Sequence, residues 1–147
     1  MALTQGRKVQ ERGARQHSHP VLAGAVIHAG ALVVLAAGWA APGRTGVGAD
    51  NAAKAADAAT LQVVGVAEEG VTGGAANGDV RVTTRAGCFF FNNLGADPLT
   101  RADIGKACFL VDDETVARTS PNNTRARAGI VDDLEDAGAW VRVGPGR

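Results

Sequence analysis

The chain has 147 residues, of which 46% are hydrophobic, 20% charged and 4% aromatic. This length suits one domain with an extension. The 15 basic and 15 acidic residues balance, whereas a dedicated nucleic-acid-binding protein usually carries a basic excess, so we expect no direct contact with nucleic acid. With 20 glycines and much alanine, the core should consist of small and β-branched side chains, and lean cores often depend on oligomerisation.

Residues 1–19 have no apolar periodicity and predict an extended polar arm. Glu11 is its only acidic residue. Its basic residues are Arg7, Lys8, Arg12 and Arg15. The segment 112–136 is acid-rich by contrast, and this asymmetry suits a basic arm that binds an acidic surface. A solvated tail would have the same composition, so both interpretations stay open.

Residues 21–41 contain no Asp, Glu, Lys or Arg and are about long enough to span a bilayer. A basic segment precedes them, which is also typical of a signal peptide or a membrane anchor. We favour two short strands linked near 29–30, because glycines divide the run into pieces of strand length that are rich in β-branched residues. A membrane-anchored or exported β protein that uses 21–41 as its apolar segment is the alternative.

Residues 43–60 begin with glycine-rich sequence and continue into an alanine-rich stretch. Alanine favours a helix, but no apolar face is present to stabilise one. These residues could therefore form a short helix or stay irregular, and we treat them as a loop or an alanine-rich insertion. Further on, Thr100 as N-cap, Asp103 three residues later and Gly105 as the stop predict one short helical turn.

From Leu61 onward the strand pattern is strong and turn residues recur at regular spacing. The expected strands are 61–67, 79–85, 88–91, 107–111, 114–118, 127–132 and 139–143. Such a series predicts an all-β fold, a small barrel or sandwich formed by one domain over residues 20–147. The extended N-terminal arm and the single helical turn complete this prediction.

The two cysteines, Cys88 and Cys108, each lie in a strand-like apolar run. We expect buried free thiols rather than a disulfide, which favours assembly in a reducing cytoplasm. The run from Phe89 to Phe91 has no interleaved basic residues, so it predicts core or a subunit interface rather than a platform for stacking bases. We take Phe89 and Phe91, together with the basic arm, as candidate partner-binding residues.

Residues for catalysis are scarce. Ser18 and Ser120, the only serines, lie in predicted loops, and no nucleophile is paired with a base, so we expect no enzymatic activity. His17 and His19 flank Ser18, but no cysteine or carboxylate lies nearby at ligand spacing. We therefore expect neither a metal site nor a cofactor.

Several motifs together resemble a known family. The first half reads Ala23-Gly24-Ala25-Val26-Ile27 and later Gly38-Trp39-Ala40, and the second half contains Gly78-Asp79-Val80-Arg81-Val82, Leu99 to Lys106 and Gly138-Ala139-Trp140-Val141-Arg142-Val143. Over residues 8–143 this pattern is similar to the capsid decoration (head cement) proteins of tailed bacteriophages and prophages. The individual motifs are loose, and residues 43–60 are longer than the family pattern.

The resemblance implies a structural virion protein that is made in the host cytoplasm and binds the outer surface of the assembled head. It would contact the major capsid protein and copies of itself, would stabilise the shell against the pressure of packaged DNA, and would not contact a membrane. Many such proteins are trimers. A low-copy head-completion or tail component is a further alternative.

Overall fold

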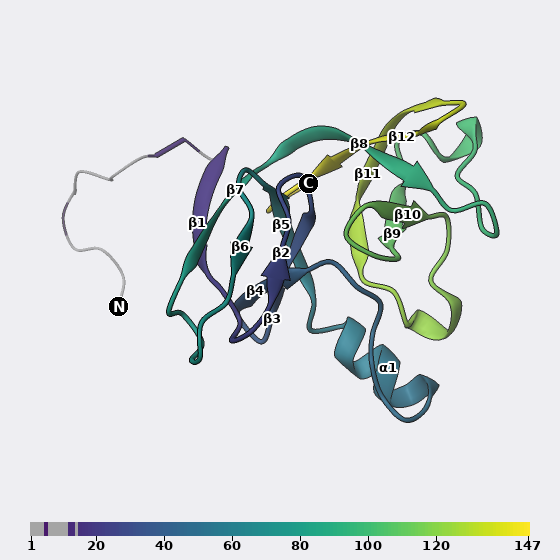
Figure 1. The fold of residues 1–147 in the computed structure, drawn as a ribbon. Helices are drawn as coiled ribbons and strands as arrows, with labels where there is room; N and C mark the ends of the chain where they lie inside the picture. The colour runs from purple at the N-terminus through teal and green to yellow at the C-terminus, as the bar shows by residue number, and fades with distance from the viewer. Residues whose placement is uncertain (1–4, 6–11, 14) are drawn as a thin grey trace.

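The computed structural model describes residues 5, 12–13 and 15–147, and its chain forms two β units joined side by side (Figure 1). The first unit is a five-stranded sheet of order β1-β7-β5-β3-β4, accompanied by a two-stranded β2-β6 ribbon. Its strands are β1 (Gln16–Pro20), β2 (Val26–Ile27), β3 (Leu32–Ala36), β4 (Trp39–Pro42), β5 (Gln62–Ala67), β6 (Val71–Thr72) and β7 (Arg81–Arg85).

The second unit is a closed barrel of order β10-β8-β12-β11-β9. Its strands are β8 (Gly87–Asn93), β9 (Ala107–Leu110), β10 (Thr115–Ala117), β11 (Arg127–Glu135) and β12 (Gly138–Val143). Helix α1 (Asn51–Ala58) and two 3-10 turns, η1 (Arg101–Asp103) and η2 (Pro121–Asn123), complete the described fold. The prediction of an all-β fold with a small barrel is confirmed.

The apolar stretch 21–41 folds into strands, as predicted, but into β2, β3 and β4 rather than two strands. The additional division lies at Ala37-Gly38, whose φ angles of 49° and 88° make a two-residue turn between β3 and β4. Alanine rarely adopts positive φ, so the residue types at 37–38 give only a weak signal for this turn. Within the described residues, no helix is long and apolar enough to cross a membrane.

Residues 51–58 form helix α1, which is one of the two outcomes left open for the alanine-rich part of 43–60. Asp50 caps the helix by accepting a hydrogen bond from the Ala53 N–H at 2.8 Å. The preceding loop packs against the helix at Gly46, where a Cβ would lie 1.9 Å from the carbonyl oxygen of Lys54. The helix therefore forms because the neighbouring loop holds it, not because it has an apolar face of its own.

The other boundaries differ only locally from the prediction. Strand β1 begins at Gln16, inside the predicted arm of residues 1–19, because these polar residues pair in register with β7. The helical turn predicted after Thr100 is present as η1, and the Asp103 carboxylate accepts the Thr100 N–H at 2.8 Å. The loop predicted at 120–124 contains the second turn, η2.

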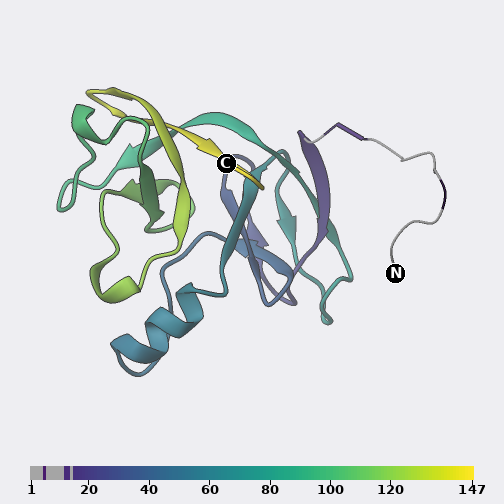
Figure 2. The ribbon, with the colours of Figure 1, turned by 180° about the vertical axis from the view of Figure 1, so that it is seen from behind.

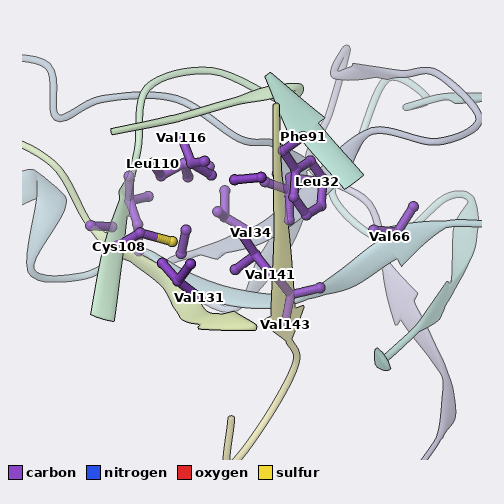
Figure 3. Close-up of a cluster of buried hydrophobic side chains, with 14 of the residues drawn as sticks. Leu32, Val34, Val66, Phe91, Cys108, Leu110, Val116, Val131, Val141 and Val143 are labelled. Atoms are coloured by element: carbon purple, nitrogen blue, oxygen red, sulfur yellow. The ribbon is translucent and has the colours of Figure 1, made fainter. Parts of the chain in front are cut away.

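One apolar cluster joins the two units. Leu32, Val34 and Val66 of the first sheet lie among barrel side chains that include Phe91, Leu110, Val131 and Val141 (Figure 3). A smaller cluster lies on the opposite face of the first sheet, and its members are Val21, Ile27, Ala31, Val33, Ala40, Val64, Ala67 and Val82. This sheet curls around the smaller cluster until Val21, just after β1, forms a bridge with Ala40 of β4.

Candidate interaction surface

The N-terminal arm joins the body through edge strand β1. The Ala86 N–H donates to the Arg15 carbonyl at 2.8 Å, and the Gln16 amide donates to Glu68. The side chains of Arg12 and Arg15 are exposed next to this junction, whereas Arg7 and Lys8 lie outside the described residues. Figure 2 shows β1 at the outer side of the sheet, away from the barrel.

Arg81 of β7 binds β1 across the sheet. Its guanidinium donates to the Ser18 hydroxyl at 2.9 Å and to the Ser18 carbonyl at 2.8 Å. This interaction occupies a backbone acceptor of an edge strand, and such partial blocking is one way in which proteins limit unwanted strand pairing. It also adds positive charge to the surface that already carries Arg12 and Arg15.

The three phenylalanines of β8 have three different environments. Phe91 is 4% exposed and belongs to the core. We had taken it as a candidate partner-binding residue, but it has almost no surface to offer a partner. Phe89 is half-buried, with the Arg85 guanidinium 5.4 Å from its ring centroid. Phe90 points to the other side of the strand and is 39% exposed.

The exposed Phe90 and the half-buried Trp140 form an aromatic pair that the sequence pattern did not predict. Their ring centroids are 5.3 Å apart on the paired strands β8 and β12. The Trp140 indole donates to Glu135 at 3.0 Å. At Gly138 a Cβ would lie 2.8 Å from Phe90 Cζ, so the absence of a side chain at this position leaves room for the Phe90 ring. Strand alternation was the available signal, because it places Phe90 opposite Phe89 and Phe91.

The acid-rich segment 112–136 does not form one acidic face. Asp132 lies 3.2 Å from Arg142, and Asp133 lies 3.7 Å from Arg101, so these charges have basic partners on the barrel. Asp113 and Glu114 instead line a shallow hollow with residues 28–31 of the first unit. The acidic surface that we had inferred from the sequence is therefore divided between two regions.

The cysteines differ from each other, whereas we had expected both to be buried. Neither forms a disulfide. Cys108 lies in the core, and burial raises the pKa of its thiol to about 12. Cys88 is exposed on β8, where partial desolvation and then the nearby Asp132 carboxylate raise its thiol pKa. The outward side of β8 therefore carries a thiol that solvent reaches.

His17 and His19 of β1 are half-buried, although they lie within the predicted extended polar arm of residues 1–19. They point to the same side of the strand, and their ring centroids are 6.1 Å apart. Burial lowers the pKa of His19, with smaller contributions from His17, Arg81 and Arg12. The ring of His19 is therefore neutral near pH 7.

The described residues contain no group of three or more His, Cys, Asp or Glu side chains arranged to hold a metal ion. Their surface features are the basic root of the arm, the Phe90–Trp140 pair and the shallow hollows between the two units. These features suit contacts with another macromolecule better than the enclosed apolar pocket that small ligands usually occupy. No protein-family model, curated protein or solved structure matches this chain.

Proposed function

We propose that this chain is a structural subunit of a virus particle that binds the outside of an assembled head shell and reinforces it. The proposal starts from the sequence resemblance over residues 8–143 to decoration proteins of tailed bacteriophages. One structural observation carries it further: a basic N-terminal segment is attached to an edge strand of a small β body. Such a segment can extend onto a neighbouring subunit while the body stays folded.

The arm and the Phe90–Trp140 pair are the proposed contact regions. Arg12 and Arg15, together with Arg7 and Lys8 further along the arm, would bind acidic groups of the major capsid protein or of a second copy. An extended arm can also add a strand to a partner sheet, which supplies backbone hydrogen bonds in addition to charge. Phe89 and Phe90 would supply the apolar part of the contact, and Phe91 is omitted because it is buried.

Repetition makes weak contacts sufficient. A shell presents many identical binding sites, and subunits that also contact one another raise the effective concentration at each site. Each contact can then be weak by itself, which agrees with an exposed aromatic area as small as the Phe90–Trp140 pair. We expect tight binding to assembled shells and weak binding to the free major capsid protein.

The direct experiment is quantitative protein composition of purified virus particles from the source. A copy number equal to that of the major capsid protein, or a simple symmetric fraction of it, would support the decoration role. A handful of copies would instead favour a head-completion or tail component. Absence from particles together with recovery in membranes would contradict the proposal and would favour the membrane-anchored alternative.

A second experiment tests the arm by charge reversal. Shells stripped of this protein are mixed with the variant R12E/R15E, and co-sedimentation is compared with that of R127E/R147E, which reverses two exposed charges outside the arm. We expect R12E/R15E to bind more weakly and to lose most of the salt dependence of binding. Equal binding of both variants would exclude an electrostatic role for the root of the arm.

A further inference from the structure

Three buried polar side-chain atoms in the described part of the chain have no hydrogen-bond partner, and all three lie together. They are His17 Nδ1, His19 Nε2 and Thr84 Oγ1. His17 and Thr84 are directly opposite each other in the β1–β7 pair, and His19 is opposite Val82. Opposed residues and residues two apart share one face of a sheet, so the three side chains line the same side.

This side faces the interior of the first unit. Thr84 and Val82 are both 0% exposed, and Val82 belongs to the smaller apolar cluster. The cationic Arg81 lies on the opposite face, where it binds Ser18. The positive charges of Arg81 and Arg12 still act on His19, and they would weaken the binding of a cation there.

Unpartnered buried polar atoms need an explanation, because almost all such atoms in folded proteins have a partner. A neutral imidazole has one nitrogen that carries a proton and one with a free lone pair. One bound guest, either a water molecule or a cation that accepts lone pairs, could satisfy the two rings and the hydroxyl on this side of the sheet.

The two rings lie near the separation that one shared cation needs. Zinc–nitrogen bonds are about 2.1 Å long, so a tetrahedral ion shared by two rings would place their centroids roughly 5.2 Å apart. The observed separation is 6.1 Å, with the ring planes inclined by 31°, so the rings would have to approach each other by about 1 Å to share an ion.

We propose that His17 and His19, with the Thr84 hydroxyl beside them, bind one Zn²⁺ ion. Imidazole nitrogens without carboxylates favour zinc and related transition metals over Mg²⁺ and Ca²⁺. Two histidine ligands leave coordination positions that a water molecule bound together with the ion would have to fill. We expect moderate affinity, because structural zinc sites with high affinity use four protein ligands. This inference is independent of the virion role.

The ion would stabilise the strand that carries the arm. Both ligands lie on β1, and Thr84 lies on β7, so bound zinc would link the edge strand to the sheet. Because a ligand that binds only the folded form stabilises it, zinc should raise the melting temperature of the whole chain. The same ion would restrict β1 at the point where the arm begins.

The test is isothermal titration of the full-length, EDTA-treated chain with Zn²⁺ and, separately, with Mg²⁺. The variants are H17Q and H19Q, and the matched control is H28Q, which alters the third, exposed histidine. We expect one Zn²⁺ per chain, no Mg²⁺ binding, and at least about tenfold weaker Zn²⁺ binding in H17Q and H19Q. H28Q should bind zinc like the unmodified chain.

Anomalous diffraction from unmodified crystals grown with Zn²⁺ keeps the test valid if a histidine variant fails to fold. A zinc peak between His17 and His19 would support the proposal. A water molecule at that position, with no anomalous signal, would overturn it and identify the guest as a buried water. Zinc binding that is unchanged in H17Q and H19Q, or lost equally in H28Q, would overturn it as well.

Discussion

The two β units are stabilised differently. The barrel is closed, so none of its five strands is a free edge, and its core contains the large side chains Phe91, Leu99 and Leu110. The first sheet is open, and the cluster that it encloses consists of valines and alanines with one isoleucine. The open sheet also carries the arm on its edge strand β1.

From this difference we infer separate roles for the two units, stability for the barrel and partner binding for the open sheet. A closed barrel with larger core residues supplies stability, because burial of large apolar side chains is the main favourable term in folding. An open sheet with an edge strand can bind a partner or an arm, at the cost of a weaker core. The shared cluster around Leu32 and Val34 couples the two, so the sheet depends on the barrel for much of its stability.

The largest expected effect follows from the shared cluster. Leu110 is fully buried, and L110A should lower the free energy of unfolding by about 2–5 kcal/mol. Trp39 lies in the first sheet and Trp140 in the barrel, so urea unfolding followed by fluorescence in W140F and W39F backgrounds reports on each unit. We expect L110A to shift both transitions equally, whereas the exposed I104A should shift neither. A shift confined to Trp140 would show that the units unfold independently.

The loop that precedes α1 gives the next effect. G46A would place a Cβ against the Lys54 carbonyl, and the required movement should cost about 1–3 kcal/mol. The helical signal in circular dichroism should also fall, because the loop at Gly46 holds α1. Gly95 is the control, since a Cβ there meets no atom within 4 Å. If G46A and G95A had equal stability, the loop would not be what holds the helix.

Low pH should destabilise the protein through the Asp97 carboxylate, which lies on the barrel. Hydrogen bonds from the Thr119 hydroxyl and backbone N–H, together with Arg125, hold the pKa of Asp97 below its usual value. A carboxyl whose folded-state pKa is lowered stabilises the protein above its unfolded-state pKa of about 3.9, and this contribution is lost as pH falls further.

The measurement is the melting temperature as a function of pH. D97N should cost about 1–2 kcal/mol near pH 7, and its difference from the unmodified chain should shrink in acid below pH of about 4. D136N, at the exposed turn between β11 and β12, should leave the curve unchanged. A D97N deficit that stayed constant down to pH of about 2 would contradict this role for the Asp97 carboxylate.

The smallest effect on stability concerns the thiols. Cys88 is exposed and Cys108 is buried with a pKa of about 12, so a thiol reagent should label one cysteine in the native chain and both after unfolding. C88S should abolish native labelling, and C108S should leave it intact. Rapid native labelling of Cys108 would indicate that the barrel opens easily, against the assignment of stability to this unit.

Local pattern was sufficient for most of the strands. The alternation of Val80 and Val82, the β-branched run after Leu61 and the turn near Gly138 all predicted elements that the structure contains. The capped turn after Thr100 was also readable, because N-cap chemistry involves residues only three apart. Alternation places Phe90 and Phe91 on opposite sides of β8, but it could not show which side is buried, because both residues are phenylalanine.

What the sequence alone determined is the all-β class, because alternation and turn residues act over a few neighbouring positions. Only the tertiary structure decided which acids pair with arginines, whether residues 51–58 form a helix, and that His17 and His19 face inward beside Thr84. The physical reason is the same in each case. Loop packing, ion pairing and burial depend on residues that are distant in the chain, such as Asp133 with Arg101 or His17 with Thr84.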